Sequence, residues 1–235
     1  MLRLHYAPDN ASLIVRLALE ELGLAYETRL VDRATSAQKS PAYRALNPRG
    51  QIPVLETDDG PIFETAAILL WLTENAPDTA PRLAPPPGDP ARGPFLSWLF
   101  ALSNGMQADL RRTFYTERYV GEDPAAIAAH RALTQARIAE ALDRFETLAG
   151  DPRPWFAAET PSILDLYLTV MLRWLALYPT GQTGWFQLAR WPRLKGLAAR
   201  VETRPAMRRA AAAEGLGPTP LTAPRPADPP EGSAL

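Results

Sequence analysis

A loop followed by two short strands holds the residue types and spacing best suited to binding chemistry. Residues 47–55 read Asn-Pro-Arg-Gly-Gln-Ile-Pro-Val-Leu, followed by Asp-Asp-Gly at 58–60 and Ile-Phe-Glu-Thr at 62–65. Pro53 has no N–H group, so it suits the first position of a strand and not the middle. A cis bond between Ile52 and Pro53 would turn the N–H and C=O of Ile52 toward a ligand along the sheet edge. This arrangement predicts a site for a peptide-like molecule.

The acidic and hydroxyl pair Glu64-Thr65 extends this site. We expect Thr65 to cap a helix over residues 66–75, whose free N–H groups attract a carboxylate. Glu64 is then placed to bind an ammonium group. An extended peptide with a free α-amino and a free α-carboxylate would fit both. A plain hairpin before an ordinary capped helix explains each residue alone, but the order of the parts favours a binding site.

This order of parts resembles the N-terminal, thioredoxin-like domain of the bacterial-type cytosolic glutathione S-transferases. In that family the pattern Asn-Pro-x-Gly-x-(Ile/Val)-Pro-x-Leu, then Asp-Gly, then Glu-Ser or Glu-Thr, holds glutathione, whose backbone lies beside a cis-proline. The resemblance covers roughly residues 1–215. It implies glutathione as co-substrate, with contacts from Gln51, Ile52, Pro53, Glu64, Thr65 and Lys39.

The turn Pro-Asp-Asn-Ala-Ser at residues 8–12 is the expected place for the glutathione sulfur. A free thiol has a pKa of about 8.5, so a hydroxyl or amide donor near a helix N-terminus must favour the thiolate. Relatives often carry a cysteine where this chain has Ala11, which excludes cysteine-based chemistry here. We therefore predict Asn10 and Ser12 as catalytic residues, with Tyr6 as a third candidate for the thiol contact.

Two features of this turn argue the other way. Asp9 or Asn10 could simply be the N-cap of the following helix, a position that both residue types favour. The carboxylate of Asp9 would also oppose formation of a nearby thiolate. The strength of thiol activation, and a glutathione carrier without catalysis, both stay open at this point.

The electrophile is expected over the thiol, between the first domain and the first long helix of the second. The predicted pocket residues are Tyr6, Met106, Arg111 and Tyr115. The cluster of Arg111 with Arg112 and Arg118 would suit an anionic co-substrate, although solvated surface arginines are the more common explanation.

Composition limits the other classes of function. The chain has 235 residues, 46% of them hydrophobic, enough for a full core. A net charge of −1 argues against a nucleic acid partner, which normally requires a concentrated basic face. Because there is no cysteine, we expect no disulfide and no thiolate metal site, and any thiol must come with a ligand. We expect no metal in the reaction.

The chain opens without a charged, then apolar, leader sequence, so we expect no signal peptide. The longest apolar stretch, residues 163–177, contains Asp165 and Arg173 and is shorter than the roughly 20 residues needed to span a bilayer. These features predict a cytoplasmic protein without a membrane partner.

The elements that must position these residues follow from local patterns. Strands are expected at 2–6 and 26–31, helices at 11–22, 40–46 and 66–75, and a hairpin between them. This β-α-β-α-β-β-α order is an α/β thioredoxin-like fold. Later residues lose strand patterns and predict an all-α helical bundle, whose buried central helix begins at a capping box over 162–165.

The predicted domains are a glutathione-binding domain, a Pro-rich linker, an all-helical domain and a Pro-rich tail, at 1–78, 79–93, 94–215 and 216–235. The predicted function is a glutathione transferase that conjugates the thiolate to an apolar electrophile, in a homodimer. A glutathione-dependent isomerase, dehalogenase or peroxide reductase on the same fold is the alternative, as is a non-catalytic binding protein.

Overall fold

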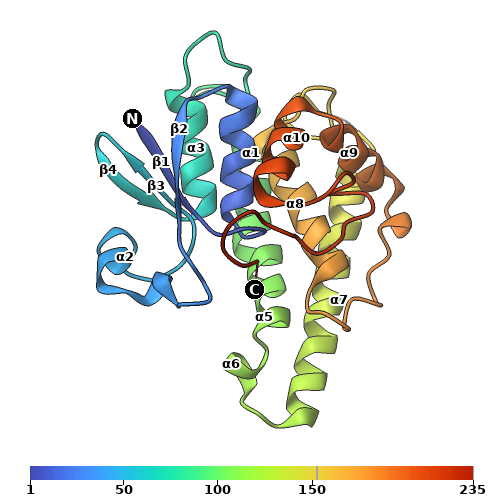
Figure 1. Cartoon of the computed structure of the whole chain (residues 1–235). Coiled ribbons are helices and arrows are strands. Elements are labelled where there is room, and N and C mark those ends of the chain that lie inside the picture. The colour runs from blue at the N-terminus through green and yellow to red at the C-terminus, as the bar shows by residue number, and fades with distance from the viewer. Residues whose placement is uncertain (152, 235) are drawn as a thin grey trace.

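The computed structural model describes residues 1–151 and 153–234, and it divides into a sheet region and a helical region (Figure 1). The elements of the sheet region are β1 (Leu2–Tyr6), α1 (Ser12–Leu22), β2 (Tyr26–Leu30), η1 (Ala37–Lys39), α2 (Pro41–Leu46), β3 (Val54–Thr57), β4 (Gly60–Phe63) and α3 (Thr65–Asn75). This order confirms the predicted α/β thioredoxin-like fold.

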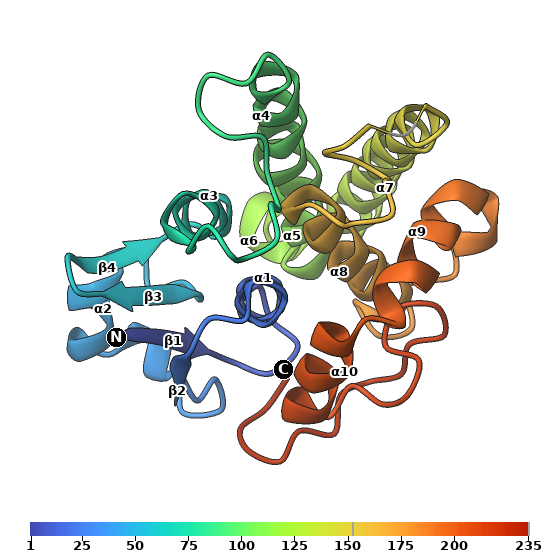
Figure 2. The same ribbon diagram turned by 90° about the horizontal axis from the view of Figure 1, so that it is seen from above.

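The four strands form one mixed sheet in the order β2-β1-β3-β4. β1 runs parallel to β2 and antiparallel to β3, so Leu4 lies between Thr28 and Leu55. Helices α1 and α3 lie together on one side of the sheet (Figure 2). α1 is buried on nearly all sides, because α8 and α10 pack on the face that the sheet leaves free.

The helical region follows from residue 92. Its elements are α4 (Arg92–Phe100), η2 (Ala101–Met106), α5 (Gln107–Phe114), α6 (Glu117–Val120), α7 (Pro124–Leu148), α8 (Ile163–Leu177), η3 (Leu188–Arg190), α9 (Pro192–Glu202) and α10 (Pro205–Glu214). Two long antiparallel helices lie side by side, with α4–η2–α5 beside α7 (Figure 1). The first of the two contains a π-helical segment, η2, which no local pattern in the sequence indicates.

The capping box of α8 is confirmed. The Ser162 hydroxyl accepts hydrogen bonds from the N–H groups of Leu164 and Asp165, at 3.1 and 3.4 Å. Asp165 accepts in return from the N–H groups of Ser162 and Ala157, both at 2.8 Å. Burial raises the pKa of Asp165 to about 6, against the effect of these N–H donors. The N-terminus of α8 is therefore fixed by the hydrogen bonds of two buried side chains, Ser162 and Asp165.

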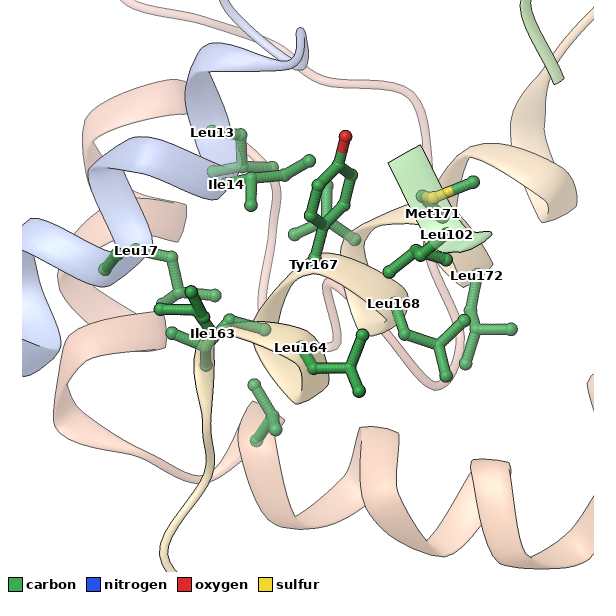
Figure 3. Close-up of a cluster of buried hydrophobic side chains, with 14 of the residues drawn as sticks. Leu13, Ile14, Leu17, Leu102, Ile163, Leu164, Tyr167, Leu168, Met171 and Leu172 are labelled. Atoms are coloured by element: carbon green, nitrogen blue, oxygen red, sulfur yellow. The ribbon is translucent and has the colours of Figure 1, made fainter. Parts of the chain in front are cut away.

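The hydrophobic core joins the two regions through α1 and α8. Figure 3 shows Leu13, Ile14 and Leu17 of α1 facing Ile163 and Tyr167 of α8. All of these side chains are buried, and they belong to one continuous cluster. The position of the α1 N-terminus is thus set by packing against the helical region.

The Pro-rich tail, residues 216–234 as described, lies across the surface and is not loose. The Glu202 carboxylate accepts hydrogen bonds from the N–H groups of Leu221 and Thr222, at 2.7 and 2.8 Å. Arg173 donates to the carbonyl oxygens of Pro220 and Arg225, both at 3.0 Å. The tail then returns to the sheet region, where its last described residues lie near α1 (Figures 1 and 2).

Within the described ranges, no helix has both the length and the hydropathy needed to cross a membrane.

Candidate functional site

A cavity of about 830 Å³ opens between the sheet region and the helical region. Its walls come from the turn after β1, the segment after β2, the loop before β3, the start of α3, the segment from η2 to α6, the end of α8 with the residues after it, and the tail. Stretches that are far apart in the sequence therefore meet at one site.

The loop before β3 is closed by its own side chains. Asn47 is buried, and its amide group donates to the carbonyl oxygen of Gln51 at 2.7 Å. Tyr43 donates to the same oxygen at 2.9 Å. Gly50 has a φ of 59°, and a Cβ there would lie 2.8 Å from the carbonyl oxygen of Gln38. The loop accordingly requires glycine and asparagine at these positions.

Gln51, Ile52 and Pro53 all line the cavity. The bond between Ile52 and Pro53 is cis, as the sequence analysis considered. Neither the N–H nor the C=O group of Ile52 takes part in a backbone hydrogen bond with another described residue. A peptide-like ligand would find both groups available at this edge.

Glu64 and Thr65 lie on the same wall of the cavity. The Glu64 carboxylate pairs with Arg49 at 2.8 Å in a largely exposed contact. The expectation that Thr65 caps α3 is wrong: Glu64 occupies the N-cap position with a φ of 72°, and no side chain caps the helix. Thr65 is instead the first helical residue, so its backbone is already helical and its hydroxyl cannot reach back to cap.

Tyr167 of α8 interacts with both Glu64 and Thr65, a contact that the sequence did not indicate. Its hydroxyl donates to Gln107 on α5. The pKa of Tyr167 is raised chiefly by burial and also by the nearby charge of Glu64, while a hydrogen bond with Thr65 opposes the rise. In Figure 3 the Tyr167 hydroxyl points away from the surrounding leucines. The central helix of the bundle thus reaches the candidate ligand site.

The turn between β1 and α1 brings one of its two predicted catalytic residues to the cavity. Asn10 lines the cavity, and its side-chain oxygen accepts from the N–H of Ala11 at 2.8 Å, which leaves the NH₂ group as a donor. Ser12 is fully buried and is not among the lining residues. Its hydroxyl donates to the carbonyl of Ala7 at 3.0 Å and accepts from the N–H of the same residue at 3.2 Å. The structure places Ser12 inside the turn.

Neither Asp9 nor Asn10 is the N-cap of α1, the non-catalytic role that the sequence also allowed for them. Ala11 holds that position, without a side-chain cap. Asp9 instead has a φ of 49° and directs its carboxylate into the helical region. The left-handed backbone is one that aspartate tolerates better than most residues.

Four donors from α8 and the residue after it surround the Asp9 carboxylate. Arg173 donates from Nε and Nη2, both at 2.9 Å, and both side chains are fully buried. Trp174 donates from its ring N–H at 2.9 Å, and Tyr178 from its hydroxyl at 2.7 Å. The expected penalty of Asp9 on a nearby thiolate is therefore offset by the positive charge of Arg173. In the sequence Arg173 is a charged residue within the apolar stretch 163–177, and no local pattern indicates its partner.

Glu214 of α10 holds the backbone of the same turn. Its carboxylate accepts from the N–H of Asp9 at 2.8 Å and from Arg16 of α1 at 2.8 Å. Burial raises the pKa of Glu214 to about 7, although Arg16 works in the opposite direction. The turn thus depends on two buried carboxylates, one of its own and one from the helical region.

Tyr6 is not brought into the cavity. Its ring lies under the guanidinium of Arg16, at 4.6 Å, and its hydroxyl donates to Glu231 of the tail. Burial and Glu231 raise its pKa. The structure therefore corrects its predicted place in the substrate pocket, because the tail covers this face of β1.

Of the remaining predicted site residues, two line the cavity and two do not. Arg111 and Tyr115 line the cavity. Met106 is buried in the hydrophobic core, because it lies on the inner side of η2. Lys39 lies on an exposed part of η1 and is not among the lining residues.

Several lining residues have no counterpart in the sequence analysis. They are Arg33, Ser103, Asn104, Gln107, Trp174, Tyr178 and Ala234. Arg33 donates to the Tyr115 hydroxyl at 3.1 Å and to the Ala234 carbonyl at 2.6 Å. No motif indicates these positions, since they come together only through the packing of α5, α8 and the tail. The described residues contain no group of three histidine, cysteine or acidic side chains arranged to hold a metal ion.

Comparisons with known proteins agree with this geometry. Residues 11–75 match the family model of the glutathione S-transferase N-terminal domain, and residues 128–200 match that of the C-terminal domain. The chain is 29% identical to glutathione S-transferase GST-4.5 of Xanthomonas campestris, over 74% of this chain and 82% of the relative. It is 30% identical to a maleylacetoacetate isomerase of Pseudomonas aeruginosa, over 87% of this chain and 92% of the relative.

Among solved structures, a glutathione transferase homologue from Sulfitobacter with bound glutathione is similar, with a TM-score of 0.75 and 26% identity. The match covers 89% of this chain and 96% of that one.

Proposed function

Because this chain belongs to the glutathione S-transferase family, we propose that it binds glutathione, stabilises the thiolate and adds it to an electrophile. The observation that carries the proposal is that one cavity is lined by Asn10, Ile52, Glu64 and Thr65 together. These residues offer a hydrogen-bond donor for the thiol sulfur, free backbone groups for a peptide, and an acidic group beside a helix N-terminus. Glutathione needs all three.

The binding roles follow from the chemistry of each group. The γ-glutamyl ammonium group would pair with Glu64, and its carboxylate would lie at Thr65 and the first N–H groups of α3. The N–H and C=O of Ile52, beside Pro53, would bind the cysteinyl backbone. Gln51 would donate to the glycine carboxylate, with Lys39 as a more distant cation.

We propose Asn10 as the donor to the sulfur. Its NH₂ group is not used by the Ala11 contact, and α1 begins directly after this turn, which adds the partial positive charge of a helix N-terminus. The Ser12 hydroxyl is already bonded in both directions to Ala7, so we give Ser12 the role of holding the turn. The thiol proton leaves to solvent before the attack. When the thiolate attacks, its lone pair forms the new sulfur–carbon bond; the electrons of the attacked bond depart with a leaving group or, at an activated double bond, move to the neighbouring carbon, which takes a proton from water.

A titration tests this proposal. The ultraviolet absorbance of bound thiolate is followed between about pH 5 and 9, a range that includes the ordinary thiol pKa of about 8.5. We expect bound glutathione to show a thiolate with a pKa well below that value. Binding without thiolate would indicate a carrier in place of an enzyme. Absence of binding would contradict the assignment of Ile52, Glu64 and Thr65.

A glutathione-dependent isomerase is the second candidate. Arg33, Arg49, Arg111 and Arg112 line the cavity, which suits an acidic substrate, and the Pseudomonas relative is named as an isomerase. The two reactions differ in what happens to the thiol. A transferase consumes one thiol per turnover, whereas an isomerase returns it, so the thiol titre after many turnovers distinguishes them.

We further propose a homodimer that works in the cytoplasm and detoxifies electrophiles. Phe63 on the edge strand β4 and Phe100 at the end of α4 are large apolar side chains with 36% and 45% of their surface exposed. Burial of such side chains would favour association of two copies. Light scattering should give twice the chain mass of 25.8 kDa, and Phe100→Ser should shift it toward the monomer. Cell fractionation tests the location.

A further inference from the structure

Three arginines surround one tyrosine at the helical wall of the cavity. Arg33, from the segment after β2, donates to the Tyr115 hydroxyl at 3.1 Å. The guanidinium of Arg118 lies 4.2 Å from the centre of the Tyr115 ring, and that of Arg111 lies 5.6 Å from it. The three cations come from both regions of the molecule and gather around one side chain. We call Arg33, Arg111, Arg118 and Tyr115 the arginine cluster.

The arginine cluster lacks an acidic partner among the residues that the structure describes. The other arginines of the cavity are paired: Arg49 with Glu64, and Arg112 with Asp109. The buried Arg173 behind the cavity is paired with Asp9. None of the three cluster arginines forms an ion pair with a described carboxylate. Like charges close together repel one another, and an anion bound between them would relieve that repulsion.

The cluster faces the cavity and not only the solvent. Arg33, Arg111 and Tyr115 all line the cavity, whereas Arg118 contacts the Tyr115 ring but is not among the lining residues. A guanidinium has five N–H groups, and Arg33 uses one on Tyr115 and one on Ala234. It therefore keeps donors for a ligand. The planar fork of donors suits a carboxylate, which it binds through two parallel hydrogen bonds.

The same wall is polar in other respects. Ser103, Asn104 and Gln107 line it from η2 and the start of α5. The two lining carboxylates, Asp9 and Glu64, are each bound to an arginine. The field in this half of the cavity is consequently positive, which attracts an anion and repels a cation.

We propose that the second substrate is an electrophile that carries a carboxylate, bound by Arg33 and Arg111 at Tyr115. The inference rests on the proposed function, because it names the substrate class of the same site. It replaces the apolar electrophile expected from the sequence. Glutathione also carries carboxylates, so the glycine carboxylate is the other source of the same chemistry. The γ-glutamyl carboxylate is assigned to α3.

A matched pair of electrophiles tests the proposal. Ethacrynate carries a carboxylate and an unsaturated ketone; its methyl ester has the same ketone without the charge. In both, the thiolate adds to the double bond and the neighbouring carbon takes a proton from water. We expect the protein to prefer ethacrynate over the ester in kcat/KM about tenfold, after correction for the uncatalysed rates, and the preference to shrink with added salt.

Variants assign the preference to residues. Arg33→Gln and Arg111→Gln should each lower kcat/KM for ethacrynate about fivefold to tenfold and leave that for the ester unchanged. Arg144→Gln makes the same charge change on the exposed side of α7 and should change neither value. Equal rates with the two electrophiles in the unmodified protein, or an equal loss on both in the variants, would overturn the proposal.

Calorimetry with glutathione separates the two sources of carboxylate. The Kd of glutathione should be the same in Arg33→Gln and Arg111→Gln as in the unmodified protein. If Arg33→Gln weakens glutathione binding tenfold and leaves the ethacrynate preference intact, Arg33 binds the glycine carboxylate and the proposal fails.

Binding of ethacrynate without glutathione separates this inference from the proposed function. A protein that conjugates neither compound, yet binds ethacrynate more tightly than the ester, would support the anion site and contradict the transferase. A protein that conjugates both compounds at equal rates would support the transferase and contradict the anion site.

Discussion

Two stretches that meet in the cavity are built in different ways. The loop and hairpin of residues 47–65 are held by contacts within that stretch or close to it: Asn47 with Gln51, and Arg49 with Glu64. The turn of residues 8–12 is held mainly by residues more than 160 positions away, Arg173, Tyr178 and Glu214. The first is a local structure, and the second is an assembled one.

This difference separates recognition from activation of the ligand. The local stretch presents the groups that would bind the glutathione backbone and its γ-glutamyl end. The assembled turn presents Asn10, the proposed donor to the sulfur. Since Asp9 is locked to α8, the turn takes its geometry only when the helical region has packed against α1. The binding groups therefore depend on local contacts, whereas the sulfur site requires the packed helical region.

The largest effect is expected from Arg173→Met, which keeps much of the volume of the side chain and removes its charge. It leaves the buried Asp9 carboxylate without its cation, so the free energy of unfolding should fall by about 3–5 kcal/mol. Urea denaturation measures this value. The control Arg144→Met removes an exposed pair with Glu140 and should cost at most about 0.5 kcal/mol. A loss below about 1 kcal/mol in Arg173→Met would mean that the turn does not depend on α8.

The second effect concerns pH and Glu214. Its pKa is raised from 4.5 to about 7 in the folded state. Between these values the folded protein binds one proton more than the unfolded chain, so stability falls as pH rises, by up to about 1.4 kcal/mol per pH unit. Glu214→Gln should remove this contribution to the slope.

Denaturation midpoints at several pH values between about 4.5 and 7 measure the slope. Glu140→Gln, at an exposed position on α7, is the control and should leave the slope unchanged. If Glu214→Gln also keeps the slope of the unmodified protein, the buried Glu214 does not titrate in this range.

Glu64→Gln tests the local stretch and should weaken glutathione binding by about 10-fold to 100-fold, the value of about 1.5–3 kcal/mol for a charged hydrogen bond. Stability should barely change, because Glu64 is largely exposed. The matched variant Arg49→Gln removes the competing partner of Glu64, so glutathione should bind equally well or more tightly. Calorimetric titration gives both values, and unchanged affinity in Glu64→Gln would remove Glu64 from the site.

The smallest effects distinguish Asn10 from Ser12. Asn10→Ala should raise the pKa of the bound thiol by about one unit, or about 1.4 kcal/mol, with little change in stability. Ser12→Ala should leave that pKa unchanged and lower the free energy of unfolding by about 1–2 kcal/mol, because two buried polar groups of Ala7 lose their partner. Thiolate absorbance and urea denaturation separate the two variants; the opposite pattern would exchange the two roles.

Much of the fold could be predicted from local patterns. The strand at residues 2–6, the helix expected at residues 11–22 and the capping box at Ser162 are found where the sequence indicates them. Prolines and glycines mark these ends, because their backbone restrictions act within a few residues. The π-helical segment η2 could not be predicted, since no local pattern specifies it.

The candidate site also contains residues that local patterns predict and residues that only packing places. Ile52, Pro53, Glu64 and Thr65 line the cavity where the sequence pattern led us to expect them. Their spacing within one hairpin leaves few other arrangements. Tyr6, Ser12 and Met106 have suitable chemistry, but the direction of a side chain depends on what packs around it. Tyr6 is bonded to the tail, Ser12 is bonded within its own turn, and Met106 packs in the core.

The α/β fold of the first region, the capped central helix and the candidate ligand-binding stretch follow from local sequence, because neighbouring residues set the backbone there. Three contacts depend instead on long-range packing: Arg173 neutralises Asp9, Arg33 donates to Tyr115, and the tail covers Tyr6. These contacts join residues that are far apart in the chain. Charges and hydrogen bonds act over a few ångströms in space, so their partners are fixed only when α1, α8 and the tail have packed together.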